Sequence, residues 1–476
     1  MKRILFVTSE AHPLIKTGGL ADVSSSLPKA LADLGQDIRI IIPNYQAIKK
    51  TENVQHRCTL RINNCDVNIL ETRLPDSKVI VWLIDCPQFF DYPGNPYHDE
   101  YGNAWANSAD RFSLFCRITV EVAMNRAYLD WKPEIVHCND WQSGLVPALL
   151  TLEYNRPATI FTIHNMAYQG IFPYSTYNAL NLPRQLWNPN ALEYYGNMSF
   201  LKGGIACSDR VTTVSPTYAK EIQSSEFGYG LEGLLTHRKE FLSGILNGTD
   251  NDWNPEFDSN IVQRYNHKTL HHKQTNKAAL QERLSLPLEP SIPIFGLISR
   301  LVEQKGIDLL LECLPELLSM PVQFVLLGSG NKSFEQRLYN FAEAYPEKMS
   351  ITIGYDEQLA HWIEAGSDIF LMPSRFEPCG LNQMYSQRYG TLPIVRKTGG
   401  LADTVVDALP HTIDNKTATG ITFNESTPSS LLEAIKRALI LYRVPEIWTQ
   451  LQTNAMKKDF SWNSSAKQYL SLYDHL

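Results

Sequence analysis

The sequence predicts an α/β protein built from two doubly wound domains, each with a parallel sheet covered by helices. Two observations predict this fold. Short β-branched runs alternate with segments in which apolar residues recur at helical spacing, and this pattern stops near residue 247 and then begins again. The chain of 476 residues is also long enough for two or three domains of roughly 150 residues each.

The first series of runs predicts the sheet of the N-terminal domain. Runs of this kind are typical of strands that are buried on both faces. Helical spacing between them predicts helices over 20–34 and 108–127. The runs are ILFVT (4–8), IRIII (38–42), VIVWLI (79–84), EIVHC (134–138), TIFTIH (159–164) and VTTVS (211–215).

The second series predicts the sheet of the C-terminal domain. Its runs are IPIFGLIS (292–299), VQFVLLG (322–328), ITIGY (351–355), DIFLMPS (368–374) and LPIV (392–395). Between the two series, the Asn-Gly and Asn-Pro pairs within 247–255 are typical of loops, so we expect a hinge there. The expected domains are residues 1–246 and residues 247–459. A last helix, expected over 460–476, has apolar residues at helical spacing and needs a surface to cover them.

Composition excludes several classes of protein. Lys and Arg number 43 against 50 Asp and Glu, and the formal net charge of −7 argues against binding to nucleic acid. No apolar run is long enough to span a bilayer, and the one near the N-terminus is too short for a signal sequence, so we expect no membrane partner. The eight cysteines form no C-x-x-C pair, which is typical of reduced thiols and predicts a cytoplasmic protein.

The heptapeptide KTGGLAD occurs twice, at 16–22 and at 397–403. Both copies follow a predicted strand and open a predicted helix, where glycine lets backbone N–H groups approach a ligand and the helix dipole favours an anion. Ligands of open α/β sheets bind outside the carboxyl ends of the strands. The duplication and the flanking lysines favour two ligand-binding loops on one cleft over two tight turns without a ligand.

Two cations follow the predicted strand that ends near Ser299. Arg300 can bind two phosphate oxygens at once while Lys305 supplies a point charge, so the pair suits a pyrophosphate. The alternative is that both are solvated charges at the start of a helix. If the cleft is correct, Lys16 of the other domain faces them.

The segment PSRFEPCGLNQMYSQRYGT, 373–391, predicts a strand, a loop and a helix, with Pro378 in the first turn of the helix. We expect the backbone N–H groups of Cys379, Gly380 and Leu381 to point toward a phosphate or a sugar hydroxyl. Glu377 either accepts hydrogen bonds from a polyol or caps the helix. Cys379 is either a thiol with thiolate character or a small buried hydrophobe.

His164 lies at the end of a predicted strand, within reach of the same cleft, and is either structural or catalytic. Side chains that could stack on or hydrogen bond to a sugar lie nearby in the sequence. They belong to TIHNMAYQG (162–170), HCNDW (137–141) and NPYHDEYGNAW (95–105).

Two other motifs only weakly indicate a binding site. GYGLEG (228–233) matches the dinucleotide pattern G-x-G-x-x-G but follows a polar, helix-like segment instead of a strand. Asp250-Asn251-Asp252 resembles a Mg²⁺-binding acidic pair, yet it lies in the expected hinge, where Asp and Asn favour turns. We therefore predict no NAD site, no metal and no other cofactor.

Five phrases together resemble the bacterial glycogen synthases and plant starch synthases. They are KTGGLADV, HCNDW, TIHNMAYQG, SRLVEQKG and PSRFEPCGLNQMYSQRYGTLPIVRKTGGLADT, in that order and over nearly the whole chain. The resemblance implies a GT-B glycosyltransferase with two Rossmann-like domains and the active site between them. It also implies transfer of glucose from ADP-glucose to an α-1,4-glucan, such as glycogen, starch or a maltooligosaccharide, with retention of configuration and without a metal.

The resemblance also implies roles for residues on the phosphate side. Lys16 and the backbone of Gly18 and Gly19 would contact phosphates. Arg300 and Lys305 would stabilise the charge that develops on the departing diphosphate.

On the sugar side, the resemblance implies that His164 binds the transferred glucose near its anomeric centre and Glu377 binds its hydroxyls. Asp140 would lie in the same sugar pocket. Asn247 and Tyr355 would line the nucleotide side. The helix at the C-terminus would cross back onto the N-terminal domain, and domain closure would exclude water.

Some positions depart from the family pattern. Tyr385 stands where related transferases often have a second Glu. Asn139 stands where His is usual, which leaves the acceptor open, and Asn382 stands where Thr is common, which leaves the choice between ADP-glucose and UDP-glucose open. The N-terminus favours a bacterial enzyme, although an excised mature plastid chain would look the same.

Three alternatives remain from the sequence. A dinucleotide-dependent oxidoreductase explains two Rossmann-like halves but lacks the fingerprint after a strand. A non-catalytic glucan-binding protein has little use for Lys305 and Glu377 together. A related retaining GT-B transferase with UDP-glucose or another acceptor is the nearest alternative.

Overall fold

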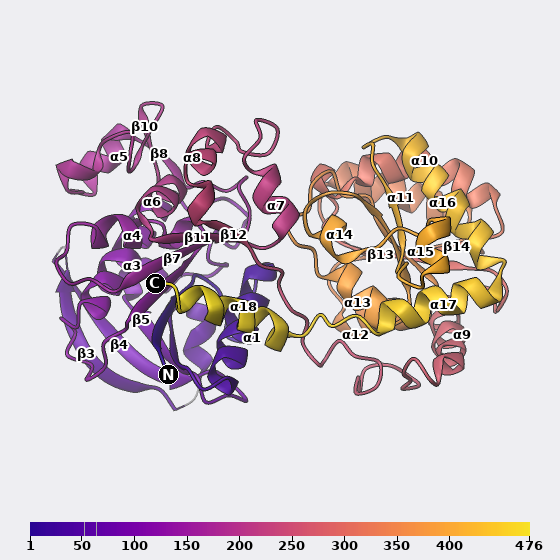
Figure 1. Ribbon diagram of the computed structural model, residues 1–476, viewed down its shortest axis with the longest axis horizontal. Helices are drawn as coiled ribbons and strands as arrows, with labels where there is room; N and C mark the ends of the chain where they lie inside the picture. Colours follow the sequence, from indigo (N-terminus) through magenta and orange to yellow (C-terminus); the bar gives the residue numbers. More distant parts are fainter. Residues whose placement is uncertain (52, 63) are drawn as a thin grey trace. The chain divides into compact units, whose positions relative to one another are not determined.

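The computed structural model describes residues 1–476 except residues 52 and 63. It divides into two compact units (Figure 1). Unit 1 comprises Met1–Gly248 together with Trp462–Leu476, and unit 2 comprises Thr249–Ser461. The limits expected from the sequence lie two residues before each of these boundaries.

Within the described residues, unit 1 is built on a nine-stranded sheet in the order β12-β11-β7-β6-β1-β2-β5-β4-β3. Neighbouring strands from β12 to β5 are parallel. The core of central β1 is fully buried, which explains why a continuous apolar run predicts it. The strands are β1 (Arg3–Val7), β2 (Asp37–Pro43), β3 (Gln55–Ile62), β4 (Cys65–Arg73), β5 (Ile80–Asp85), β6 (Ile135–Asn139), β7 (Ala158–Ile163), β11 (Arg210–Thr213) and β12 (Leu242–Gly244).

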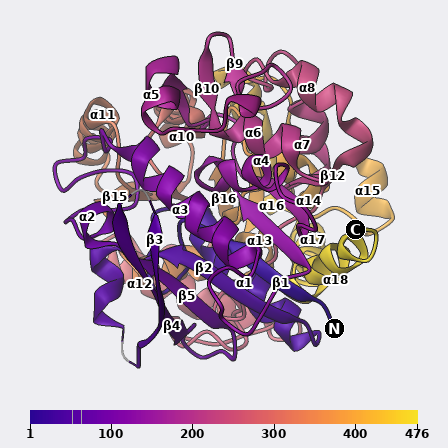
Figure 2. The same cartoon turned by 90° about the vertical axis from the view of Figure 1, so that its left-hand side faces the viewer.

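One edge of this sheet departs from the parallel pattern. β3 and β4 form an antiparallel hairpin, β4 is also antiparallel to β5, and the three strands lie side by side (Figure 2). The sequence did not predict this hairpin, because polar and apolar residues alternate in it and β3 is largely exposed. A small antiparallel sheet was also unexpected; it contains β8 (Ile171–Pro173), β9 (Glu193–Tyr194) and β10 (Asn197–Ser199).

The helices of unit 1 include the last helix of the chain. They are α1 (Gly19–Asp33), α2 (Pro87–Phe90), α3 (Ser108–Ala123), α4 (Leu145–Leu150), α5 (Tyr174–Ala179), α6 (Phe200–Cys207), α7 (Pro216–Glu221), α8 (Glu232–His237) and α18 (Trp462–Tyr473). Because α3, α4 and α6 pack in succession while α1 pairs with α18, the C-terminal helix completes the helical cover beside α1 (Figure 1).

A buried histidine ties α18 to the sheet of unit 1. The Tyr473 hydroxyl lies 2.8 Å from Nδ1 of His137, which belongs to β6 and is fully buried. Tyr469 lies against the same ring, with centroids 5.4 Å apart. Tyr469 is buried in this contact, whereas the neighbouring Leu470 is only partly buried.

Unit 2 contains, in the described part of the chain, a six-stranded parallel sheet in the order β15-β14-β13-β16-β17-β18. Its main core joins these strands to α10, α16 and α17. The strands are β13 (Ile294–Ile298), β14 (Gln323–Gly328), β15 (Met349–Ile353), β16 (Ile369–Met372), β17 (Leu392–Arg396) and β18 (Ile421–Phe423). The helices are α9 (Lys273–Arg283), α10 (Ile307–Ser319), α11 (Lys332–Ala344), α12 (Glu357–Gly366), α13 (Asn382–Arg388), α14 (Gly399–Thr404), α15 (Pro410–Asp414), α16 (Pro428–Tyr442) and α17 (Pro445–Met456).

Both units thus have the doubly wound α/β architecture that the sequence predicts. Among the described residues, no helix combines the length and the apolar character that crossing a membrane requires.

Candidate functional site

Predicted residues of unit 1 lie at the carboxyl ends of β1, β6 and β7. These strands are neighbours and parallel, so the residues that follow them lie at one edge of the sheet. His164 follows β7, Asp140 follows β6, and the first KTGGLAD copy follows β1.

Asn139 orients the ring of His164 and fixes its tautomer. Nε2 of His164 lies 3.0 Å from Oδ1 of Asn139, whose amide nitrogen donates to the Val7 carbonyl at 3.1 Å. The Asn139 oxygen must therefore accept a hydrogen bond from Nε2–H of His164. Burial lowers the pKa of His164 to about 3, so the ring is neutral at pH 7, and its Nδ1 can accept a hydrogen bond from a sugar hydroxyl.

Asp140 contacts the backbone of His164. Its Oδ1 accepts the His164 N–H at 2.8 Å, and its own backbone has a φ of 54°, in the left-handed region. Burial raises the pKa of Asp140 to about 7, although backbone hydrogen bonds from His164 and Asn165 lower it. Near pH 7 this carboxyl can therefore either donate to or accept from a hydroxyl.

Residues 16–19 of the first KTGGLAD copy are exposed, and its glycines face open space. α1 begins at Gly19, and a Cβ at Gly18 or Gly19 would meet no atom within 4 Å. Lys16 Nζ pairs with Asp22 Oδ1 at 2.8 Å. The N–H groups of Thr17 and Gly18 donate to Oε2 of Glu10, so the Gly18 N–H that the sequence assigned to a phosphate is engaged within the protein.

In unit 2 the loops after β13 and β16 meet at an ion pair. Lys305 Nζ lies 2.5 Å from Oε2 of Glu377, which also accepts a hydrogen bond from Ser374 Oγ at 3.0 Å. Gly306 permits this approach, because its φ is 69° and a Cβ there would lie 2.1 Å from the Pro373 carbonyl oxygen. The structure thus brings together two residues that the sequence selected separately, 72 positions apart.

Other predicted residues of unit 2 lie at the same sheet edge. Arg300 follows β13 and is exposed. Tyr355 follows β15, is 81% exposed, and its hydroxyl lies 3.3 Å from Oε2 of Glu357. An exposed aromatic ring can stack on a nucleotide base.

The helix after Glu377 begins later than predicted. α13 starts at Asn382, and no side chain caps it, so Glu377 is not its cap. Gly380 has a φ of 73°, which interrupts helical geometry. The N–H groups of Cys379, Gly380 and Leu381 therefore lie before the helix, and the predicted start of the helix was wrong. Cys379 is 5% exposed and takes the buried alternative.

The second KTGGLAD copy packs against this same loop. A Cβ on Gly399 would lie 2.0 Å from the Glu377 carbonyl oxygen, and one on Gly400 would lie 2.1 Å from the Cys379 carbonyl oxygen. Gly400 N–H is within hydrogen-bond distance of the carbonyl oxygens of Glu377 and Pro378, at 3.2 and 3.1 Å. Its glycines are buried against the Glu377 loop and support it.

Three positions outside these loops complete the comparison with the sequence. Asn247 is buried, and its Oδ1 accepts no hydrogen bond from the residues that the structure describes. Trp141 is half-buried and packs against Phe112 and Phe200. Tyr385, where a second Glu was expected, stacks on Trp253 with centroids 4.5 Å apart.

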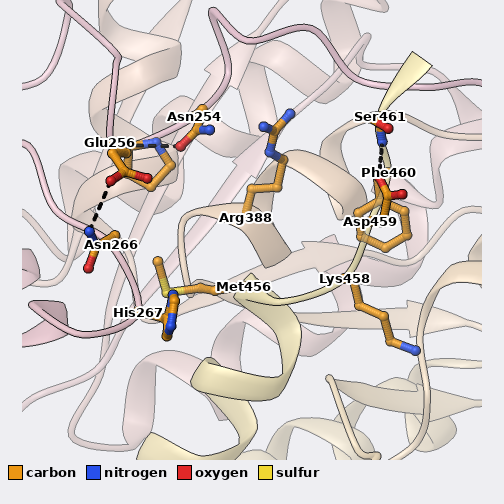
Figure 3. Close-up of a pocket in the computed structure, with 11 residues that line it drawn as sticks. Asn254, Glu256, Asn266, His267, Arg388, Met456, Lys458, Asp459, Phe460 and Ser461 are labelled. Carbon is orange, nitrogen blue, oxygen red and sulfur yellow. Dashed lines mark hydrogen bonds between the residues drawn. The ribbon is translucent and has the colours of Figure 1, made fainter. Parts of the chain in front are cut away.

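A polar pocket of about 160 Å³ lies elsewhere in unit 2 (Figure 3). Glu256 and Asn266 hydrogen bond to each other on one side of it, and Arg388 Nη1 donates to Thr249 Oγ1 at 2.7 Å. None of the predicted site residues lines this pocket, so the chemistry described above lies outside it.

Two family models match the chain. Residues 3–237 match the starch synthase catalytic domain, and residues 281–456 match glycosyl transferases group 1. The chain is 54% identical over 472 residues to glycogen synthase 1 of Methylococcus capsulatus, covering 99% of this chain and 96% of that one. It is also 54% identical to the glycogen synthase of Cellvibrio japonicus, over the full length of both.

Solved structures show a similar fold. The catalytic domain of starch synthase IV from Arabidopsis thaliana, bound to ADP and acarbose, has a TM-score of 0.90 and 34% identity, covering 100% of this chain and 99% of that one. A sucrose-phosphate synthase from Thermosynechococcus elongatus has a TM-score of 0.60 at 17% identity and is alike in fold alone. The predicted GT-B fold is thereby confirmed.

Proposed function

Because the chain belongs to the glycogen synthase family, we propose that it transfers glucose from ADP-glucose to the non-reducing 4-hydroxyl of an α-1,4-glucan, with retention of configuration. The relatives' names support the glucan product. ADP in the starch synthase IV structure supports ADP-glucose over UDP-glucose. Glycogen, starch and maltooligosaccharides are the acceptors of this class.

The observation that carries the proposal is the contact between Lys305 and Glu377 at the carboxyl ends of adjacent strands. A lysine fixed in this way supplies positive charge to a departing diphosphate, and its glutamate partner can accept hydrogen bonds from sugar hydroxyls. Arg300, exposed at the same edge, adds a second cation.

We assign six further predicted residues to the same reaction. Lys16 and the backbone at Gly19 contact phosphate, and Tyr355 and Asn247 contact the nucleotide. His164 and Asp140 hold the transferred glucose, His164 through the acceptor nitrogen Nδ1.

We propose that the acceptor attacks on the same face that the diphosphate leaves. The glucosyl–phosphate bond breaks, ADP takes the electron pair, and the leaving phosphate oxygen receives the proton of the acceptor 4-hydroxyl. The carboxyl groups nearby are poor nucleophiles: Glu377 is paired with Lys305, and Asp140 is partly protonated near pH 7. A covalent glucosyl-enzyme detected by mass spectrometry would contradict this mechanism.

We also propose that the reaction needs no metal and takes place in the cytoplasm. The cations Arg300 and Lys305 can perform the neutralisation that a divalent metal performs in other transferases. The bacterial relatives and the scattered cysteines support the location.

The test is nucleotide release from ADP-glucose and UDP-glucose, measured side by side with and without glycogen, in EDTA. Glycogen-dependent ADP release with chain growth is the expected result. Preference for UDP-glucose would overturn the choice of nucleotide, loss of activity in EDTA would overturn metal independence, and no release from either donor would overturn the transferase itself.

A further inference from the structure

Glu10 is a buried carboxyl group that the proposed mechanism does not use. It is 2% exposed and lies after the central strand β1. Its Oε2 accepts the N–H groups of Thr17 and Gly18 at 2.5 and 3.1 Å, and its Oε1 accepts a short hydrogen bond from the Tyr97 hydroxyl. Tyr97 in turn lies 2.9 Å from Ser9 Oγ.

We infer that Glu10 is a positioning residue for the donor, which fixes the loop at 16–19 so that Lys16 and the start of α1 present one arrangement to the diphosphate. The inference rests on the proposed function, which places the donor phosphates at this loop.

Packing alone does not hold this loop. Glycine backbones have wide conformational freedom, and Gly18 and Gly19 have no atom within 4 Å of the place where a Cβ would stand. Hydrogen bonds from two successive N–H groups to one carboxylate oxygen supply the missing restraint. Without the Glu10 oxygen, both N–H groups must hydrogen bond to water instead, and the loop can adopt other conformations.

Glu10 also decides which N–H groups a ligand can reach. Because it engages Thr17 and Gly18, an anion is directed to the N–H groups at the start of α1, beginning with Gly19. Burial raises the pKa of Glu10, although hydrogen bonds from Tyr97, Thr17 and Gly18 lower it. A carboxyl group that holds a proton more readily repels a neighbouring diphosphate less.

The inference is tested by comparing Glu10→Ala with Glu10→Gln. The glutamine carbonyl oxygen can still accept both N–H groups, whereas alanine accepts neither. We expect Glu10→Ala to raise KM for ADP-glucose at least about tenfold while kcat changes less than about threefold, and Glu10→Gln to stay within about threefold in both. Glu134→Ala is the control, since Glu134 accepts the Arg3 N–H at the opposite end of β1, and it should change neither constant.

Amide hydrogen exchange of peptides covering 14–20, without ligand, separates this inference from the proposed function. Exchange should be faster in Glu10→Ala and unchanged in Glu10→Gln. Wild-type KM and exchange in Glu10→Ala would overturn the inference, as would an equal loss of donor affinity in both variants. A wild-type chain that transfers no glucose while the exchange difference persists would overturn the proposed function and leave the restraint by Glu10 standing.

Discussion

The two copies of KTGGLAD have the same sequence and open a helix at the same glycine pair, yet the fold uses them differently. Gly18 and Gly19 are exposed and face open space, whereas Gly399 and Gly400 are buried against the Glu377 loop. Each copy lies beside a glutamate. Glu10 meets the first copy through its side chain, while Glu377 meets the second through its main chain, which leaves the Glu377 carboxylate to Lys305.

Glycine pairs can serve two purposes that the sequence alone does not distinguish. In the first copy they leave open space, where we propose that the donor phosphates bind, and in the second they leave room for the protein's own backbone. The surrounding loops, and not the heptapeptide, decide which of the two occurs.

The largest expected effect comes from removing the cation that the second copy helps to place. Lys305→Ala should lower kcat by about 10²- to 10³-fold, because it removes positive charge from the departing diphosphate. Initial rates with ADP-glucose and glycogen measure this. Lys332→Ala is the matched control, since Lys332 also pairs with a glutamate of unit 2, and it should keep full activity. Full activity in a folded Lys305→Ala would refute the assigned role.

The next prediction compares a Gly→Ala substitution at equivalent positions of the two copies. Gly400→Ala should lower the free energy of unfolding by about 2–3 kcal/mol, because its Cβ would lie 2.1 Å from the Cys379 carbonyl oxygen. Gly19→Ala, at the equivalent position of the first copy, should change it by less than about 0.5 kcal/mol. Urea unfolding of both variants measures the difference. Equal losses would mean that the two copies are packed alike.

Substitution of the lysine, in contrast, should have the larger effect in the first copy. Lys16→Ala should lower kcat/KM for ADP-glucose by about tenfold, the cost of one charge-assisted contact to phosphate. Lys397→Ala should change it by less than about twofold, because the glycines of this copy are buried against the Glu377 loop. Steady-state kinetics at varied donor concentration measure both, and an equal loss would show that both copies bind the donor.

The smallest effect concerns the carboxyl group of Asp140, which follows β6 in unit 1. The pKa of Asp140 is raised from 3.8 to about 7 in the folded chain, so its contribution to stability is present below about pH 4 and is lost as the pH rises through 7. Asp140→Asn has no charge to bury and should be more stable than the wild type at pH 8. Urea unfolding as a function of pH should show this gain shrink toward pH 4. A gain that is independent of pH would contradict the raised pKa.

Much of the fold could be predicted because central parallel strands are continuous apolar runs. The hairpin of β3 and β4 could not, since an edge strand covered on one face carries alternating polar residues. The helix α18 was predicted from its spacing, but its contact with His137 depends on a residue more than 300 positions away.

The site was predictable residue by residue but not as an arrangement. Lys305 and Glu377 stood out in motifs, while their ion pair follows from the adjacency of β13 and β16. Glu10 was missed, because a single glutamate belongs to no motif. Its position just after the central strand, at the edge where ligands bind, was the only signal that could have found it.

The most direct test is hydrogen exchange of the two heptapeptides in one experiment, with and without saturating ADP. Exchange of residues 16–22 should slow down when ADP binds. Residues 397–403 should exchange slowly from the start and remain unchanged. Slowing confined to 397–403 would contradict the assignment of the first copy to the ligand and the second to the Glu377 loop.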